Sequence, residues 1–308
     1  MAMSLEHLQR AVELDPDFGR AYARIAIHWV IMGNYDYAPA KRAYDETERL
    51  ARQAIELDGE LFEAHWALGW AQVARYDWPE AEASFRKVIK LAPGNWEGYH
   101  SLGMLQGMLG RYAEAMTAAQ IAIDLDPLSY RPWLGMEFLY TRQRAYEDSI
   151  RVKLESATRN GWDDFTRANM ALLLALAGRP DEARTYLLEV EAENSQDKNV
   201  QVTLATVYNM LGEPDRALSL VEPLKQRYLN DPGQVAPGSL AWAYASLGDN
   251  DQAMEFLLAA REQEDANLWF LDDPAFDGLR NDSRFVELIR GLNLPEEIYL
   301  SPVTGDTQ

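Results

Sequence analysis

The stretch Gly110-Arg-Tyr-Ala-Glu-Ala115 recurs along the chain at a fixed spacing. Close copies with an initial glycine and a final alanine are Gly178-Arg-Pro-Asp-Glu-Ala183, Gly212-Glu-Pro-Asp-Arg-Ala217 and Gly248-Asp-Asn-Asp-Gln-Ala253. Weaker copies are Tyr76-Asp-Trp-Pro-Glu-Ala81 and Arg144-Ala-Tyr-Glu-Asp-Ser149. The final residues fall at positions 81, 115, 149, 183 and 217, a spacing of 34, and then at 253. Such a period indicates an array of one repeated structural unit.

The segments between these copies predict pairs of helices. Apolar residues recur three and four positions apart, and no segment alternates at period two for long, so strands are not expected. Residues 62–69 and 96–103 are predicted to lie in the first helices of two pairs. Gly69 and Gly103, again 34 apart, would let the second helix approach closely. In the second helices, Ala81 and Ala115 would serve the same close crossing, because a larger side chain would push the helices apart.

The period and these residues resemble the tetratricopeptide repeat, a helix–turn–helix unit. The resemblance implies an all-α, right-handed superhelical solenoid of about seven repeats with a short helical C-terminal cap. The predicted units are 19–61, 62–95, 96–129, 130–163, 164–197, 198–233 and 234–267. Residues 1–18 form a half-repeat, a second helix without its first. Nine extra residues in the first unit are placed around 34–40.

The half-repeat has two explanations. Either the chain is cut from a longer protein or a lone helix covers that end. We favour the cut, because a half-unit leaves an apolar side that normally needs a partner. The chain also resembles the C-terminal repeat region of bacterial multidomain regulators, through the first-unit insertion, residues 233–249 and the ending 273–295. In those proteins an adenylate cyclase, winged-helix activator or kinase domain and a TolB-like segment precede the repeats.

Composition excludes several functions. The 308 residues include 49 acidic and 29 basic ones, a net charge of −20, so nucleic acid and anionic membranes are disfavoured as direct partners. The chain has no cysteine, which excludes disulfides and thiolate chemistry. No apolar run reaches the ~18 residues of a membrane span, and no secretory signal is recognised. We expect a cytoplasmic protein, or a periplasmic one if a parent protein carries an upstream transmembrane segment.

The sequence offers no catalytic constellation. Its histidines, His7, His28, His65 and His100, form neither an HExxH motif nor a pair three or four apart. No phosphate-binding loop and no nucleophile elbow is present. We therefore expect neither an enzyme, nor a metal, nor a cofactor. His65 is predicted to lie in the core, where the repeat usually places a packing aromatic residue.

A stripe along the first helices is the candidate partner-binding site. In this architecture the first helices line the concave surface. The predicted groove residues are Trp66, Trp70, His100, Met104, Phe138 and Trp242. Such an apolar surface suits a helix or an extended peptide. Alternatively, the aromatic residues pack on one another or hold the end-piece or an upstream domain.

Polar residues near the stripe do not predict a carboxylate clamp. Asn169 and Asn209 lie on or near it, but no lysine does. Arg131 and Arg142 could anchor a ligand locally, although solvated positions are the more typical reading. The leading function is a non-catalytic protein-interaction domain of a bacterial signalling protein such as an adenylate cyclase. The alternatives are a small-ligand sensor and a self-association module, for example a homodimer.

The ending is predicted to be a helical cap, residues 268–300, before a disordered tail, 301–308. Aspartates precede Gly278, but a calcium loop beginning at Asp273 would have Ala275 at its third position and Arg284 at its twelfth, where oxygen ligands are needed. Asp273 and Asp282 instead fit the N-caps of helices. The second of these helices would bury a face consisting of Phe285, Leu288, Ile289 and Leu292. Residues 268–271 would cover the open side of the last unit.

Overall fold

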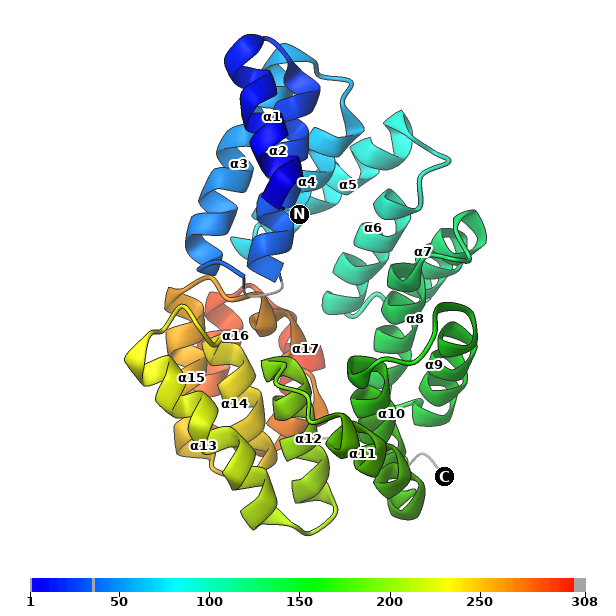
Figure 1. Cartoon of the computed structure of the whole chain (residues 1–308), viewed down its shortest axis with the longest axis vertical. Coiled ribbons are helices and arrows are strands. Elements are labelled where there is room, and N and C mark those ends of the chain that lie inside the picture. The colour runs from blue at the N-terminus through cyan, green and yellow to red at the C-terminus, as the bar shows by residue number, and fades with distance from the viewer. Residues whose placement is uncertain (1, 35–36, 302–308) are drawn as a thin grey trace. The chain divides into compact units, whose positions relative to one another are not determined.

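The computed structural model describes residues 2–34 and 37–301. Within these residues the chain is helical and contains no strand, which confirms the predicted all-α fold. The tail at 302–308 and part of the first-unit insertion, residues 35–36, lie outside the described residues. Figure 1 shows successive helices running as pairs along the chain.

Each predicted unit contains two of the helices. The first helices are α2 (Gly19–Asn34), α4 (Phe62–Ala74), α6 (Trp96–Met108), α8 (Tyr130–Arg142), α10 (Asp164–Leu176), α12 (Lys198–Met210) and α14 (Pro237–Ser246). The second helices are α3 (Ala40–Leu57), α5 (Trp78–Leu91), α7 (Tyr112–Leu125), α9 (Tyr146–Asn160), α11 (Pro180–Glu193), α13 (Pro214–Asn230) and α15 (Asn250–Glu262). A single helix, α1 (Ala2–Leu14), precedes them and packs on α2.

The turn between the helices of a pair has a left-handed residue at a constant position. Glycine occupies it at Gly110, Gly178, Gly212 and Gly248, with φ between 71° and 81°. At the two weaker copies of the motif the position holds Tyr76, with φ 60°, and Arg144, with φ 57°. A side chain in this conformation is unfavourable, because its Cβ crowds the following carbonyl oxygen. The recurring glycine therefore has a direct conformational cause.

Close helix crossing explains the small residues within a pair. A Cβ on Gly69 would lie 2.4 Å from the ring of Phe85 in α5, so the glycine makes room for that ring. Phe85, Val88, Ala81 and Ala115 are completely buried. These residues therefore lie where the two helices of a pair cross closely, as predicted.

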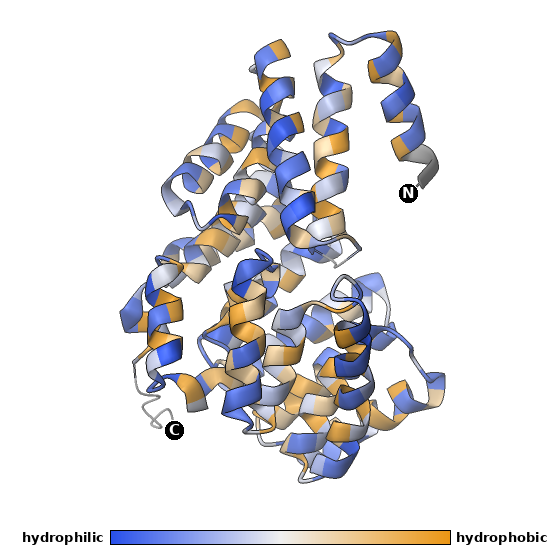
Figure 2. Cartoon of the chain, turned by 90° about the vertical axis from the view of Figure 1, so that its left-hand side faces the viewer, coloured by the Kyte–Doolittle hydropathy of each residue, from blue (hydrophilic) through white to orange (hydrophobic). Residues whose placement is uncertain are grey.

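The helices form two compact parts. Of the described residues, the N-terminal part comprises 2–34, 37–107, 111–127 and 263–266, and the C-terminal part comprises 108–110, 128–262 and 267–301. In each part, neighbouring first helices pack on one another, as α2 does on α4 and α12 on α14. Figure 2 shows hydrophobic and hydrophilic residues mixed along individual helices, as amphipathic packing requires. No described helix combines the length and apolarity that crossing a membrane requires.

The end-piece, residues 267–301, belongs to the C-terminal part. It contains the 3₁₀ helix η2 (Pro274–Leu279) and the helices α16 (Ser283–Gly291) and α17 (Glu296–Tyr299), and η1 (Ala266–Phe270) leads into it. The side chain of Asp273 accepts a hydrogen bond from the N–H of Ala275, and that of Asp282 accepts one from the N–H of Arg284. Both predicted caps are present. The expected apolar face of α16 is buried: Phe285, Leu288, Ile289 and Leu292.

Candidate functional site

In the N-terminal part, the predicted groove tryptophans lie within helix–helix packing. The indole Nε1 of Trp66 in α4 donates to Oγ of Ser101 in the neighbouring first helix, at 2.9 Å. The Trp70 ring meets the edge of Phe85 in α5 with centroids 5.5 Å apart. Both tryptophans are only 3% exposed. They therefore join α4 to its neighbours and form the base of any surface on this face.

His100 and Met104 continue the same stripe on α6. His100 is buried, and its ring packs edge-on against Trp96 at 5.7 Å. Met104, one turn further on, is half-buried. A methionine at this position offers a partner an adaptable apolar contact. Of the predicted residues in this part, Met104 is the one that is not fully buried.

In the C-terminal part, the end-piece lies on the two remaining stripe residues. The ring of Phe138 in α8 meets that of Phe270 with centroids 4.9 Å apart. The indole Nε1 of Trp242 in α14 donates to Oδ1 of Asp273 at 2.9 Å. Contacts from 268–273 therefore reach α8, in the fourth predicted unit, in addition to the last unit. One alternative to partner binding predicted from the sequence is that the aromatic residues hold the end-piece. Phe138 and Trp242 do so.

Arg142 is at the centre of this contact, and its predicted solvation is wrong. Its side chain is 2% exposed, and its guanidinium forms an ion pair with Asp272 at 2.5 Å. The same group donates to the carbonyl oxygen of Trp269 at 3.1 Å and to the hydroxyl of Tyr299 at 2.8 Å. It also lies over the Phe138 ring, 4.8 Å from the centroid. Its partners follow it by more than a hundred residues, so no local pattern revealed them.

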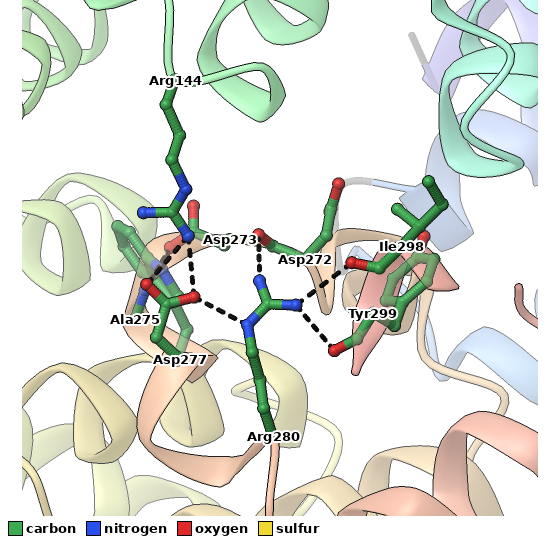
Figure 3. Close-up of polar contacts among 9 residues, drawn as sticks. Arg144, Asp272, Asp273, Ala275, Asp277, Arg280, Ile298 and Tyr299 are labelled. Atoms are coloured by element: carbon green, nitrogen blue, oxygen red, sulfur yellow. Dashed lines mark hydrogen bonds and ion pairs between the residues drawn. The ribbon is translucent and has the colours of Figure 1, made fainter. Parts of the chain in front are cut away.

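Figure 3 shows two further arginines, Arg144 and Arg280, with their contacts in the end-piece. Arg144, the residue in the left-handed turn position, donates to both carboxylate oxygens of Asp277 at 2.7 and 2.8 Å. Arg280 donates to the same carboxylate and to the carbonyl oxygens of Ile298 and Tyr299. The Tyr299 hydroxyl donates to the carbonyl oxygen of Met108 at 3.0 Å. The network ties η2 and α17 to the repeats.

Burial changes the acidity of the carboxylates in this network. Loss of solvent raises the pKa of Asp272 to about 6, although the charge of Arg142 acts in the opposite direction. Burial also raises the pKa of Asp273, opposed by its hydrogen bonds from Ala275 and Trp242. Asp272 is held by its ion pair with Arg142, and Asp273 accepts hydrogen bonds from Trp242 and Ala275. Their arrangement suits attachment of the end-piece and lacks a nucleophile with an adjacent base.

A second buried ion pair joins the two helices of one unit. Nζ of Lys153 in α9 lies 2.6 Å from a carboxylate oxygen of Glu137 in α8, and the lysine side chain is fully buried. Burial raises the pKa of Glu137, although Lys153 opposes this shift. Such a pair fixes how the two helices meet, because separating the charges inside the fold would be costly.

The other polar residues of the sequence prediction, His65, Asn169 and Asn209, make hydrogen bonds to backbone carbonyl oxygens. His65 is half-exposed and its Nε2 lies 3.0 Å from the carbonyl oxygen of Gly59, so the prediction of a core position is wrong. The amide of Asn169 donates to Phe165, and that of Asn209 donates to Ser246. Among the described residues, no three His, Asp or Glu side chains are placed to hold a metal ion together.

Comparison with known families agrees with the repeat seen in the structure. Tetratricopeptide repeat models match residues 36–95, 67–130, 174–237 and 238–262. The chain belongs to the tetratricopeptide repeat family. Proteins with these repeats generally mediate protein–protein interaction or scaffolding.

Characterised relatives are distant and much longer. Superkiller protein 3 of Schizosaccharomyces pombe is 24% identical over 207 residues, which are 65% of this chain and 14% of that protein. Anaphase-promoting complex subunit 3 of the same organism is 22% identical over 190 residues, 62% of this chain and 28% of that protein. Cellulose synthase operon protein C of Xanthomonas axonopodis pv. citri is 29% identical over 197 residues, 58% and 13%. The matched part of the chain thus spans less than a third of each relative.

Solved structures share the fold. A tetratricopeptide repeat protein from Parabacteroides merdae aligns with a TM-score of 0.55 and 16% identity, over 83% of this chain and 99% of that one. PilW, a type IV pilus biogenesis factor, aligns with the same TM-score and identity, over 70% and 96%. Identities this low show a common fold alone.

Proposed function

We propose that the chain is a non-catalytic scaffold domain that binds a protein partner through the stripe on the first helices of its N-terminal part. The single observation that carries this proposal is the half-buried Met104, one turn after His100 on α6, in a stripe whose other members in this part, Trp66, Trp70 and His100, are buried. A rigid aromatic base with an adaptable apolar group above it is typical of surfaces that bind a chain segment. Membership of a family of interaction repeats supports the same function.

In the C-terminal part, Phe138 and Trp242 are not proposed to bind the partner, because they bind the end-piece. Phe270 and Asp273 of the end-piece already engage them. The proposed partner surface is therefore restricted to the stripe residues of the N-terminal part. The −20 charge of the chain favours a partner whose binding surface is basic or neutral around its apolar contact.

The biological setting forms a further part of the proposal. We infer from the sequence resemblance that these repeats are the regulatory part of a bacterial signalling protein, with an effector such as an adenylate cyclase elsewhere in the parent. The complete reading frame of the gene tests this inference. An effector domain in the same frame is expected, and a frame without one would remove this part of the proposal while leaving partner binding intact.

A charge reversal on the stripe tests partner binding. In Met104→Glu a carboxylate replaces the half-buried apolar side chain, and the buried tryptophans remain. Partners captured by the wild-type chain should be lost, because the new charge would be desolvated on binding. Leu188→Glu is the control, since Leu188 is a 61% exposed residue of the second helix α11 and does not belong to the stripe on the first helices. Identical sets of captured proteins for the wild type and Met104→Glu would refute the proposal.

A further inference from the structure

In the C-terminal part, a set of repeat side chains binds a particular arrangement of groups in the end-piece. The repeats supply the ring of Phe138, the guanidinium of Arg142 and the indole N–H of Trp242. The end-piece supplies an aromatic ring at Phe270, then carboxylates at the second and third positions after it, Asp272 and Asp273. Each repeat side chain therefore has a matching group within four consecutive residues, 270–273.

A backbone contact fixes the position of the segment. The Arg142 guanidinium binds the Trp269 carbonyl oxygen and the Asp272 carboxylate together, three residues apart. Because the donors of the guanidinium are rigidly placed, Arg142 fixes which residues of the segment lie opposite which repeat side chains. Further along the segment, Nη2 of Arg144 donates to both carboxylate oxygens of Asp277. These contacts have the form of peptide recognition, with side-chain pockets and one main-chain anchor.

The local charge explains why an acidic segment is required. The chain carries a net charge of −20, but this face presents two arginines, one of them only 2% exposed. A buried arginine that loses its carboxylate is strongly unfavourable in a low-dielectric environment. A neutral segment in the same place would leave Arg142 without its counter-charge. The face therefore selects for carboxylates beside an aromatic residue.

The segment joins the fold through these polar contacts and through apolar side chains that are almost completely buried, Leu268, Leu271, Phe276 and Leu279. Residues 267–281 comprise η2, the end of η1 and the turns around them, and short 3₁₀ helices have poorer hydrogen-bond geometry than α-helices. The following helix α16 packs against α15 with its own buried face. Displacing residues 267–281 therefore exposes the apolar side chains of the segment and separates Phe276 from Phe285 of α16, and it leaves the segment as a loop between α15 and α16.

We propose that Phe138, Arg142, Arg144 and Trp242 form a peptide-recognition site whose resident ligand is residues 268–277. A partner segment with an aromatic residue followed two and three positions later by carboxylates binds there when it displaces the resident ligand. This inference deepens the proposed function, because it rests on the repeats being a binding domain and names the partner chemistry of a second face. The resident segment competes at the high effective concentration of a tethered ligand, which keeps the site closed to weak binders.

Two double variants of the full chain test the site from opposite sides. Phe270→Ala/Asp272→Asn weakens the resident ligand and leaves the repeat face intact. Phe138→Ala/Arg142→Met removes the corresponding contacts from the face and leaves the segment intact. The probe is a fluorescently labelled synthetic peptide with the sequence of residues 267–281. Anisotropy titrations compare its binding to each variant and to the wild type, with a scrambled peptide as a sequence control.

The ligand-side variant should bind the peptide at least about tenfold more tightly than the wild type, because its own segment competes less well. The face-side variant should bind it no better than the wild type, although its segment is equally loosened. Equal binding by the two variants, equal binding of the scrambled peptide, or no gain for the ligand-side variant would overturn the inference. None of these results bears on capture through Met104, so the two proposals fail separately.

A measurement on the unmodified chain covers the case in which the variants do not fold. Native-state hydrogen exchange should show that amides within residues 268–279 open at denaturant concentrations where α8 and α14 stay protected. If the segment and these helices exchange only together, by global unfolding, the segment is a fixed part of the core. That result would overturn the inference without any variant.

Discussion

Arg142 and Asp272 form an ion pair at 2.5 Å in which the two side chains are 2% and 5% exposed. The residues are separated by 130 positions, and their contact holds the end-piece on the C-terminal repeats. Buried pairs of this kind add little net stability over apolar packing, but they are costly to break from one side. The pair therefore fixes where the end-piece attaches. Protonation of Asp272 should change the stability of the fold measurably.

The first prediction concerns pH. The pKa of Asp272 is raised to about 6, so the folded state binds its proton more tightly than the unfolded state does. The stability associated with that proton is present at low pH and is lost as the pH rises through about 6. Asp272→Asn has no such proton. The loss of unfolding free energy caused by Asp272→Asn should be about 1 kcal/mol larger at pH ~5.5 than at pH ~7.5.

Urea denaturation of both proteins at the two pH values gives this difference. Arg142, Arg280 and Asp273 face Asp272 in both proteins, so much of the remaining pH dependence cancels. A cost that is equal at the two pH values, or larger at the higher one, would contradict the assignment of the raised pKa.

The second prediction concerns the cap helix α16. Phe285 is completely buried and stacks near Phe276 with ring centroids 6.3 Å apart. Phe285→Ala should lower the free energy of unfolding by about 3–5 kcal/mol, because it removes a large buried side chain and leaves a cavity. Phe165→Ala provides the comparison at a 37% exposed phenylalanine and should cost much less. A loss well under ~1 kcal/mol at Phe285 would show that the cap does not stabilise the array.

The third prediction tests the close helix crossing. In Gly69→Ala the new methyl group would lie 2.4 Å from Phe85 unless the ring moves. The strain should cost about 1–3 kcal/mol. Gly94→Ala is a control, because a Cβ on Gly94 meets no atom within 4 Å. Thermal denaturation that ranks the two variants as equally stable would rule out the steric explanation of the glycine at 69.

The fourth prediction separates the two roles of Arg144. Arg144→Ala and Arg144→Gly both lose the ion pair with Asp277. Only glycine also relieves the left-handed backbone conformation, whose φ is 57°. Arg144→Gly should therefore be more stable than Arg144→Ala by about 1 kcal/mol. Equal denaturation midpoints for the two variants would show that the turn carries no conformational strain.

Much of the fold could be predicted because its causes are local and repeated. The left-handed turn position and the small residues at the crossing recur every 34 residues, so the sequence displays them several times. The caps at Asp273 and Asp282 are equally local, since each aspartate binds an N–H two residues away.

The arrangement of the end-piece could not be predicted in the same way. Arg142 acquires its role from Asp272 and Tyr299, which are distant in sequence and occur once. In the sequence, Arg142 has the spacing of an ordinary polar helix residue. One signal was available at its neighbour: Arg144 occupies a position where the repeat prefers glycine, and a side chain kept in a strained turn often has a contact to make. Its partner, Asp277, could be identified only from the structure.

The central claim, that the N-terminal stripe binds a protein partner, is tested most directly by photo-crosslinking. A photoreactive amino acid is placed at position 104 in one full-length variant and at the exposed position 188 in another. After irradiation in cells, mass spectrometry identifies the attached proteins. We predict a defined partner crosslinked from position 104 and absent from position 188. No crosslinked protein at position 104, or the same proteins from both positions, would contradict the account.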